Sequence, residues 1–137
     1  MKFFAPKSNR QVNIDISDYL VDWDKEVSKP QKKVKDLIRP YWAAHVVLEE
    51  FRIPKTLQRV DIINLTTRVA IEVSPKGSHA FNPFFHKNRV KFSQMVAREL
   101  SKIEWLERNG FKVVELNDED LANLSREWME EKHGIIL

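Results

Sequence analysis

Three short apolar segments follow one another closely in the middle of the chain, and they limit the folds it can adopt. Residues 45–53, 59–66 and 68–74 are rich in β-branched and aromatic side chains, and only a few residues separate each segment from the next. Parallel strands need a crossover of a dozen or more residues between them. Connections this short therefore predict an antiparallel meander of three strands.

A helix is predicted immediately before the meander. Ser28 is a suitable N-cap, and Pro30 suits an early helical position. Val34 and the apolar residues that follow it occupy i, i+3 and i+4 positions of one helical face. Pro40 is expected to end or bend this helix, because it lacks a backbone N–H.

After the meander the pattern becomes helical again. Residues 87–109 predict the longest helix, and residues 111–116 a further strand. A last helix is expected from Asn117 or Asp118 to about Lys132. The order α-β-β-β-α-β-α predicts an α/β (α+β) fold with a mixed sheet flanked by helices. The buried side of the long helix is expected to carry Val90, Met95, Val96, Leu100, Ile103 and Leu106.

The chain is expected to form one domain preceded by an arm. Its 137 residues suit a single domain, which we place at 28–137, with an N-terminal arm at 1–27. It has no cysteine and three glycines, which excludes disulfide scaffolds, cysteine-rich zinc sites and glycine-rich phosphate loops. No apolar run approaches the ~20 residues that span a bilayer. The expected location is intracellular, and no membrane partner is expected.

Charge is segregated along the chain. The net charge is +3, but residues 76–112 carry +5 and residues 113–137 carry −5. A further basic cluster lies between Lys29 and Arg39. One interpretation is that these are ordinary solvated helix faces. The other is that two basic surfaces bind a nucleic acid backbone while the acidic surface is turned away from it.

Two acidic residues interrupt apolar strands of the meander. Asp61 lies in RVDII and Glu72 in VAIEV. A buried charge is costly unless it is paired, hydrogen-bonded or bound to a cation. Neighbouring strands of a hairpin would bring the two carboxylates together, and Mg²⁺ or Mn²⁺ would then stabilise them and could activate water for attack on a phosphodiester. The simpler alternative is that Asp61 pairs with an arginine and Glu72 lies at a strand end.

In this order of elements the chain resembles the PD-(D/E)XK nuclease superfamily. That family carries an acidic residue on the second strand, here Asp61, and Glu-x-Lys on the third, here beginning at Glu72. Within residues 28–116 the chain is similar, more narrowly, to very-short-patch-repair-like and phage junction-resolving endonucleases. The matching segments are SKPQKKV, EEFRIP, RVDIIN, IEV, GSH, FFHKNRV and KIEWLERNGFKVVEL. The resemblance implies a restriction-endonuclease-like core and a metal held by Asp61, Glu72 and the carbonyl of Val73.

The lysine of the family motif is replaced in this chain. Ser74 stands at that position, where the family's lysine orients water or stabilises charge on phosphorus. Lys76, two residues further on, is the favoured substitute. Lys91 or Lys102 could also supply the ammonium group from the following helix.

A second departure concerns the first helix. Many relatives place a glutamate there to complete the metal site, and Gln31 holds that position here. Glu50 would then have to support the metal from the first strand of the meander. Glu49 and Glu50 are expected to point to opposite faces of their strand, so that only one of them approaches the site.

Histidines and basic residues follow the second carboxylate. The resemblance places His79 near the scissile phosphate, as a base or a phosphate donor. The alternative is a loop histidine without a role. His86 directly precedes Lys87 at the start of the long helix, whose N-terminus is a reasonable anion site. The predicted nucleic-acid-binding residues are Lys32, Lys33, Lys35, His86, Lys87, Arg89 and Lys91.

These observations predict a metal-dependent endonuclease that hydrolyses DNA phosphodiester bonds. The resemblance implies selectivity for branched, mismatched or nicked DNA and a role in phage DNA processing or repair. Catalysis is assigned to Asp61, Glu72, Lys76 and His79. A homodimer would provide the two active sites that a junction resolvase needs. The alternatives are a nucleic-acid-binding module without catalysis on the same fold, and a small scaffold or inhibitor that uses the acidic C-terminal helix.

Overall fold

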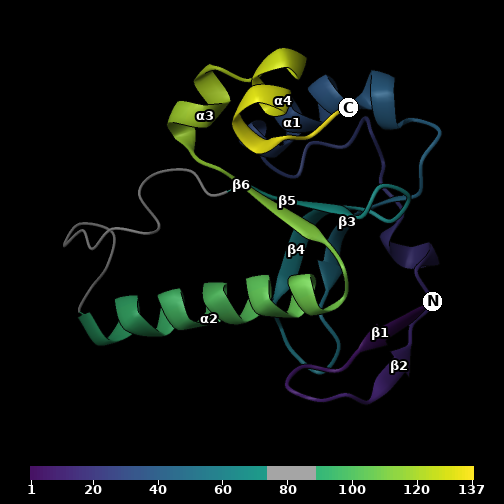
Figure 1. Cartoon of the computed structure of the whole chain (residues 1–137), viewed down its shortest axis with the longest axis vertical. Helices are drawn as coiled ribbons and strands as arrows, with labels where there is room; N and C mark the ends of the chain where they lie inside the picture. Colours follow the sequence, from purple (N-terminus) through teal and green to yellow (C-terminus); the bar gives the residue numbers. More distant parts are fainter. Residues whose placement is uncertain (74–88) are drawn as a thin grey trace.

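The structure is a computed structural model that describes residues 1–73 and 89–137 (Figure 1). Two small N-terminal strands come first, and a four-stranded sheet with its helices follows. The elements in chain order are β1 (Lys2–Phe4), β2 (Gln11–Asn13), a 3-10 turn (Ser17–Tyr19), α1 (Lys29–Trp42), β3 (Val47–Arg52), β4 (Arg59–Asn64), β5 (Val69–Val73), α2 (Arg89–Arg108), β6 (Lys112–Leu116), α3 (Asp118–Ala122) and α4 (Arg126–His133).

The central sheet has the strand order β3-β4-β5-β6. β3 pairs antiparallel with β4, and β4 antiparallel with β5, as the short connections predict. β6 pairs parallel with β5, with Ile71 opposite Val114, and α2 lies in the connection between them. The predicted α/β class, with a mixed sheet flanked by helices, is therefore confirmed.

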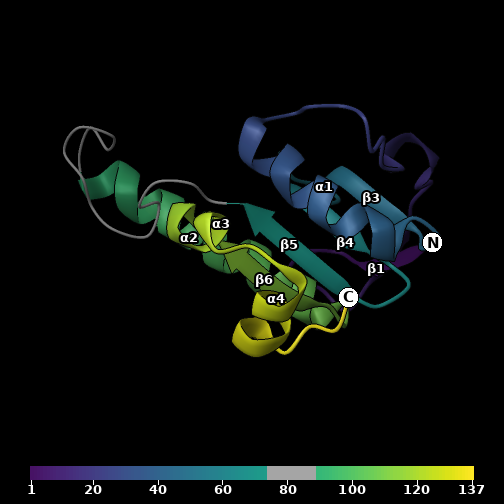
Figure 2. The same ribbon diagram turned by 90° about the horizontal axis from the view of Figure 1, so that it is seen from above.

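Helices cover both faces of the sheet and bury two separate apolar clusters. On one face α1, α3 and α4 pack over the strands, with Ile38, Trp42 and Met129 buried among them. Seen from above, α1 lies over β3 and β4, and α3 and α4 lie over β6 (Figure 2). On the other face α2 and the β1–β2 pair bury a second cluster around Phe51 and Trp105. The sheet is thus the middle of three layers.

The N-terminal segment contributes to this second cluster. The sequence predicts one strand, over Gln11 to Ile16, and the structure adds β1 as its antiparallel partner. Phe3 on β1 is 1% exposed, and its ring centroid lies 5.1 Å from that of Phe51 and 5.7 Å from that of Trp105. Residues 1–4 therefore supply part of the core.

Helix ends agree with the sequence at some positions and differ at others. Ser28 caps α1 as predicted, its side chain accepting the backbone N–H of Gln31 at 3.3 Å. Pro40 does not end α1, which continues to Trp42. Because Pro40 lies in the last turn, its missing N–H removes only one bond near the end of the helix.

The predicted C-terminal helix is two helices. Asn117 caps α3 in a capping box, as expected, but α3 ends at Ala122. Ser125 then caps α4 by accepting the backbone N–H of Trp128 at 3.0 Å. The prediction of one continuous helix is wrong, because this serine side chain begins a new helix instead of extending the first.

Only the second half of α2 packs on the sheet. Leu106 is fully buried, whereas Val90 and Leu100 are 67% and 62% exposed. The prediction that these two residues lie on the buried side is wrong. The first half of α2, which begins with Arg89 and Val90, projects beyond the edge of the strands (Figure 1), whereas Leu100 lies in the second half on the side that faces solvent.

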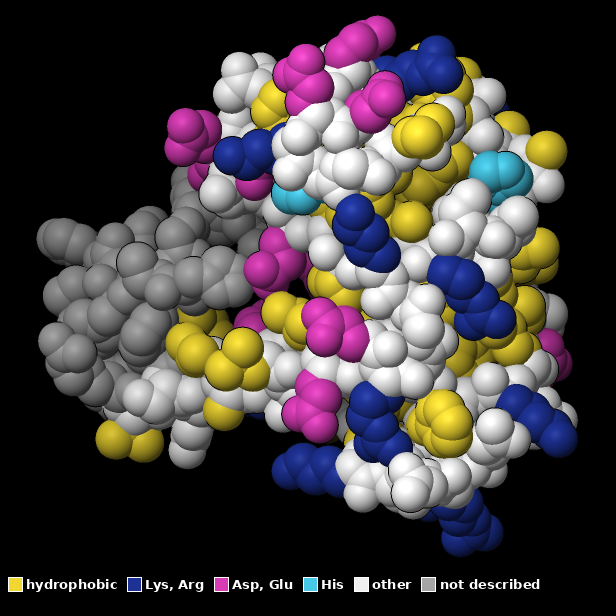
Figure 3. Space-filling model, in the orientation of Figure 1, with side chains coloured by type: hydrophobic (Ala, Val, Ile, Leu, Met, Phe, Trp, Pro, Cys, Tyr) yellow, Lys and Arg dark blue, Asp and Glu magenta, His cyan; other side chains and the backbone are white. Residues whose placement is uncertain are grey.

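Acidic side chains gather on the surface of α3 and α4, in line with the −5 charge of residues 113–137 (Figure 3). The first turn of α3 alone carries Asp118, Glu119 and Asp120. Within residues 1–73 and 89–137, no helix has the length and apolar character needed to cross a membrane.

Candidate functional site

Asp61 and Glu72 lie next to one another on β4 and β5. Ile62 pairs with Ile71 across these strands, and the next residues in the same direction are Asp61 and Glu72. The backbone N–H of Val73 donates to Asp61 Oδ2 at 2.8 Å, and the charge of Asp61 acts on Glu72 beside it. The hairpin therefore brings together the two carboxylates that the sequence singles out.

α2 adds a lysine to this pair. Lys102 Nζ lies 3.3 Å from Glu72 Oε1 and 3.6 Å from Glu99 Oε1, and Glu99 lies one helical turn before it. Lys102 Nζ and Glu72 Oε1 are within ion-pair distance but do not form a hydrogen bond. Glu72 Oε1 is therefore a buried oxygen atom without a hydrogen-bond partner. Lys102 is one of the two helix lysines considered as substitutes for the motif lysine, and the structure places it against the candidate site.

The environment raises the proton affinity of both carboxyl groups. Burial, then the neighbouring charge of Asp61, raise the pKa of Glu72 to about 9, although Lys102 opposes this rise. Burial also raises the pKa of Asp61, against the N–H of Val73 and the hydrogen bond from Glu72. Two carboxyl groups this close cannot both ionise easily. At neutral pH and without a cation, the pair holds a proton.

The proton on Glu72 makes stability depend on pH. In the folded protein the pKa of Glu72 is about 9, against an ordinary value of 4.5, so the folded state binds more protons between these values. The free energy of unfolding should therefore fall as pH rises from about 5 to 9, and Glu72→Gln should reduce this slope. Urea unfolding in EDTA across this range measures it. Glu104→Gln, at an exposed position of α2, is the control; an unchanged slope in Glu72→Gln would contradict the assignment.

The oxygen atoms around this pair partly suit a hard divalent cation. Mg²⁺ commonly takes one or two protein carboxylates and completes its shell with water and substrate phosphate oxygens. Asp61, Glu72 and the carbonyl of Val73 are the groups that would hold it, and the unsatisfied Oε1 of Glu72 is available to a cation. No cluster of three His, Cys, Asp or Glu side chains that could hold a metal occurs in the described part of the chain. Water and substrate would have to supply the other ligands.

Gln31 lies beside the glutamates of β3 and not directly against Glu72. Its Nε2 donates to Glu49 Oε2 at 2.8 Å and to Glu50 Oε1 at 3.3 Å. Burial raises the pKa of Glu50, and the nearby charge of Asp61 adds to the rise. Glu50 therefore contacts Gln31 and is near enough to Asp61 to be affected by its charge.

The expectation that Glu49 and Glu50 point to opposite faces is wrong. Both accept a hydrogen bond from the same nitrogen of Gln31. The reason is the backbone of Glu50, whose φ of 54° is in the left-handed region and breaks the alternation of side chains along β3.

The basic residues of α1 are mostly engaged within the protein. Lys35 is fully buried and donates to Glu49 and to two backbone carbonyls. It is therefore not available to a nucleic acid, contrary to the prediction. The ammonium group of Lys33 donates to the carbonyl of Leu121 at 2.6 Å, and Lys32 pairs with Asp36. The basic pattern of this helix thus reflects its packing.

Several predicted residues lie outside the part of the chain that the structure describes. Arg89 begins α2, and Lys91 lies in its first turn with an exposed side chain. The residues outside the described ranges are Ser74, Lys76, His79, His86 and Lys87.

Comparisons with protein-family models, with curated proteins and with solved structures give no match for this chain. The resemblance to PD-(D/E)XK nucleases therefore stays a prediction, which depends on the motifs and on the order of elements.

Proposed function

We propose that this protein is a metal-dependent endodeoxyribonuclease that hydrolyses phosphodiester bonds in branched, mismatched or nicked DNA. The observation that carries the proposal is the pair of buried carboxyl groups that Asp61 and Glu72 form on neighbouring strands, with Lys102 Nζ 3.3 Å from Glu72 Oε1. A carboxylate pair with an adjacent ammonium group is a suitable arrangement for charge stabilisation at a phosphate. A role in phage DNA processing or repair inside the host cell, and a homodimer, belong to the same proposal.

The roles of the protein groups follow from their positions. Mg²⁺ bound by Asp61 and Glu72 would polarise the scissile phosphate and acidify a bound water. The N–H of Val73 fixes the orientation of the Asp61 carboxylate by its 2.8 Å bond. Lys102 is the described residue positioned to donate to a non-bridging phosphate oxygen. Lys76 and His79 remain candidates for the same chemistry.

The test is cleavage of labelled four-way junctions, mismatched duplexes and plain duplexes in Mg²⁺, Mn²⁺ or EDTA. Cleavage that requires the metal and favours the junction or the mismatch is the expected result. Binding should weaken with rising salt, because phosphate contacts release counterions. Cleavage that persists in EDTA would contradict the proposal.

A second candidate function is nucleic-acid binding without catalysis. Lys102 already lies at ion-pair distance from Glu72, where a cation would bind, and the helix position of the family's glutamate is the neutral Gln31. These features favour a site in which an internal ammonium replaces the metal. This function predicts salt-dependent DNA binding, no cleavage with either metal, and no effect of Mn²⁺ on thermal stability.

Lys102→Met should separate the two functions of the ammonium group. Loss of the phosphate donor should lower the rate of cleavage about 10²–10³-fold. Because the ammonium also competes with a cation for Glu72, the same variant should bind Mn²⁺ more tightly than wild type. Rates measured against Mn²⁺ concentration resolve both effects, and Lys102→Arg should restore part of the rate. Lys132→Met, the same change at an exposed position of α4, is the control. A weaker apparent Mn²⁺ affinity in Lys102→Met would contradict this role.

A further inference from the structure

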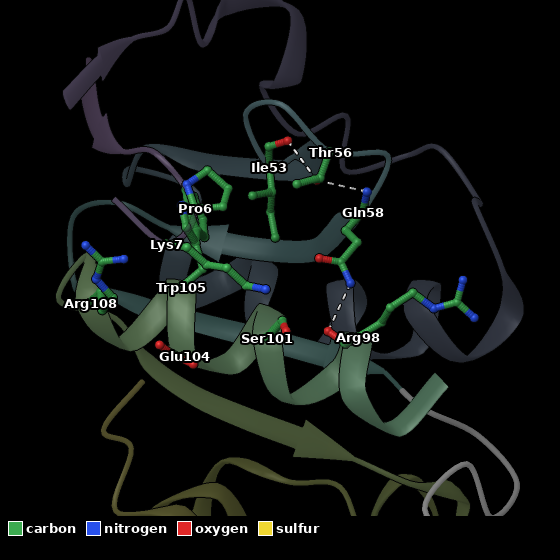
Figure 4. Close-up of a pocket in the computed structure, with 10 residues that line it drawn as sticks. All are labelled: Pro6, Lys7, Ile53, Thr56, Gln58, Arg98, Ser101, Glu104, Trp105 and Arg108. Atoms are coloured by element: carbon green, nitrogen blue, oxygen red, sulfur yellow. Dashed lines mark hydrogen bonds between the residues drawn. The ribbon is translucent and has the colours of Figure 1, made fainter. Parts of the chain in front are cut away.

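A cavity of about 280 Å³ lies beside α2, and neither Asp61 nor Glu72 lines it (Figure 4). α2 lines it with Arg98, Ser101, Trp105 and Arg108, whose spacing of three, four and three residues puts them on one helical face. The other walls come from the β3–β4 turn and from the segment that joins β1 to β2. All of its lining residues belong to the described part of the chain.

The floor of this α2 cavity is apolar and fixed. Trp105 is 3% exposed and Ile53 is 1% exposed, and Pro6 completes the apolar wall. Trp105 Nε1 donates to the carbonyl of Phe4 at 2.7 Å, which holds the indole in place. The floor therefore offers a preformed apolar surface to a flat group.

Two polar side chains face the space above this floor. Gln58 Nε2 donates to the carbonyl of Arg98 at 2.9 Å, and this bond leaves Gln58 Oε1 oriented as an acceptor. Ser101 presents a hydroxyl from α2 beside it (Figure 4). An acceptor and a hydroxyl at the edge of an apolar slot are suited to the edge of a heterocycle, which carries donors and acceptors in its plane.

Cations surround the opening. Lys7, Arg98 and Arg108 line the cavity against one carboxylate, Glu104. Arg98 and Arg108 are ten residues apart, about 15 Å along the helix axis, and their guanidinium groups extend outward in opposite directions (Figure 4). The two guanidinium groups thus lie at the rim of the cavity, whereas the Lys7 side chain extends across it toward Gln58 (Figure 4).

We propose that the α2 cavity accepts the base of one unpaired nucleotide of a DNA strand, with the neighbouring phosphates on the rim cations. A nucleotide has the same distribution of properties as the cavity: a flat base with a polar edge, and anionic groups outside it. An aliphatic ligand would leave the Gln58 and Ser101 groups unused, and an acidic peptide would leave the apolar floor unused.

This inference rests on the proposed function, and it links the cavity to the candidate active site. Arg98 and Ser101 line the cavity, while their neighbours Glu99 and Lys102 lie beside Glu72. Successive helical residues are about 100° apart around the axis, so the same turns of α2 face both places. A strand with one base in the cavity would therefore lie close to the carboxylates, which would favour DNA that contains unpaired nucleotides.

The test uses a duplex with a one-nucleotide 2-aminopurine bulge, in EDTA, so that no cleavage occurs. Wild-type protein should protect the 2-aminopurine from acrylamide quenching. Ser101→Leu fills the cavity from an exposed position and should abolish this protection and weaken binding of the bulged duplex about tenfold. Binding of the fully paired duplex should be unaffected. Ser93→Leu, the same change at an exposed serine two turns away, is the matched control and should behave as wild type.

Several results would overturn the inference. They are a bulged base that stays fully quenchable when bound, equal effects of Ser101→Leu and Ser93→Leu, or absence of binding to the bulged duplex at low salt. Equally tight binding of free deoxyadenosine monophosphate would also overturn it, because it would assign the cavity to a small metabolite. Protection of the base without any cleavage in Mg²⁺ or Mn²⁺ would support the cavity and reject the nuclease. Cleavage without protection would do the opposite.

Discussion

Lys35→Met should lower the free energy of unfolding by about 3–5 kcal/mol. Lys35 is fully buried, and its Nζ donates to the carbonyls of Asp22 and Lys25, at 2.6 Å and 2.7 Å, and to Glu49 Oε1 at 2.9 Å. Methionine fills a similar volume but leaves the Glu49 carboxylate without its cation and two carbonyls without a donor. A buried polar group that loses its partner destabilises the folded state by its full desolvation free energy. Urea unfolding followed by tryptophan fluorescence measures the loss.

Lys32→Met is the matched control, because it is the same change on the same helix. Lys32 forms a surface ion pair with Asp36, whose side chain is 58% exposed, and such pairs contribute about 0–1 kcal/mol. The double variant Lys35→Met/Glu49→Leu should recover part of the stability, because it removes the unpaired carboxylate as well. Equal stability of Lys35→Met and Lys32→Met would contradict the role of this buried network.

The buried network also shows why the basic pattern of α1 misleads. Lys32, Lys33 and Lys35 are close together in sequence and resemble a phosphate-binding cluster. Their environments differ because an α-helix turns by about 100° per residue. Lys35 falls on the side that carries Val34 and Ile38, and all three are buried. Charge counting along a chain cannot separate a solvated lysine from one that ties two segments together.

The fold was predictable where hydrophobic period and connection length agree. The meander, the crossover helix and β6 each follow from local pattern, and the structure confirms them. The exposure of Val90 was not predictable, because it depends on where the sheet ends beneath α2, and that of Leu100 depends on which side of the helix faces the strands. Strand β1 is only three residues long, too short to give a periodic signal.

The carboxylate pair of the candidate site was predictable from the sequence, but the residues around it were less so. Adjacent strands of a hairpin place Asp61 and Glu72 together, and that inference needs only the register. The contact of Lys102 with Glu72 depends on how α2 crosses the sheet, so sequence spacing favoured the nearer Lys76. The left-handed φ of Glu50 has no sequence signal, because glycine is the residue expected at such a position.

Asp61→Asn and Glu72→Gln should each lower metal-dependent DNA cleavage by at least about 10³-fold, the equivalent of roughly 4 kcal/mol in transition-state stabilisation. Both changes preserve shape, and the amide oxygen introduced by Asp61→Asn can still accept the N–H of Val73, which binds the Asp61 carboxylate at 2.8 Å. Folding should therefore survive, and circular dichroism and urea unfolding provide the check. Cleavage of a labelled junction in Mg²⁺ and in Mn²⁺ gives the rates.

Binding to the same junction in EDTA separates chemistry from recognition. Each variant removes an acidic group and no phosphate contact, so the affinity should stay within about threefold of wild type or increase. Glu107→Gln, which removes an exposed carboxylate of α2 away from the cavity, is the control and should cleave at the wild-type rate. Retained cleavage in both site variants would remove Asp61 and Glu72 from the chemistry. Lost cleavage with retained binding would assign the reaction to this pair, because only the charge that holds the cation has changed.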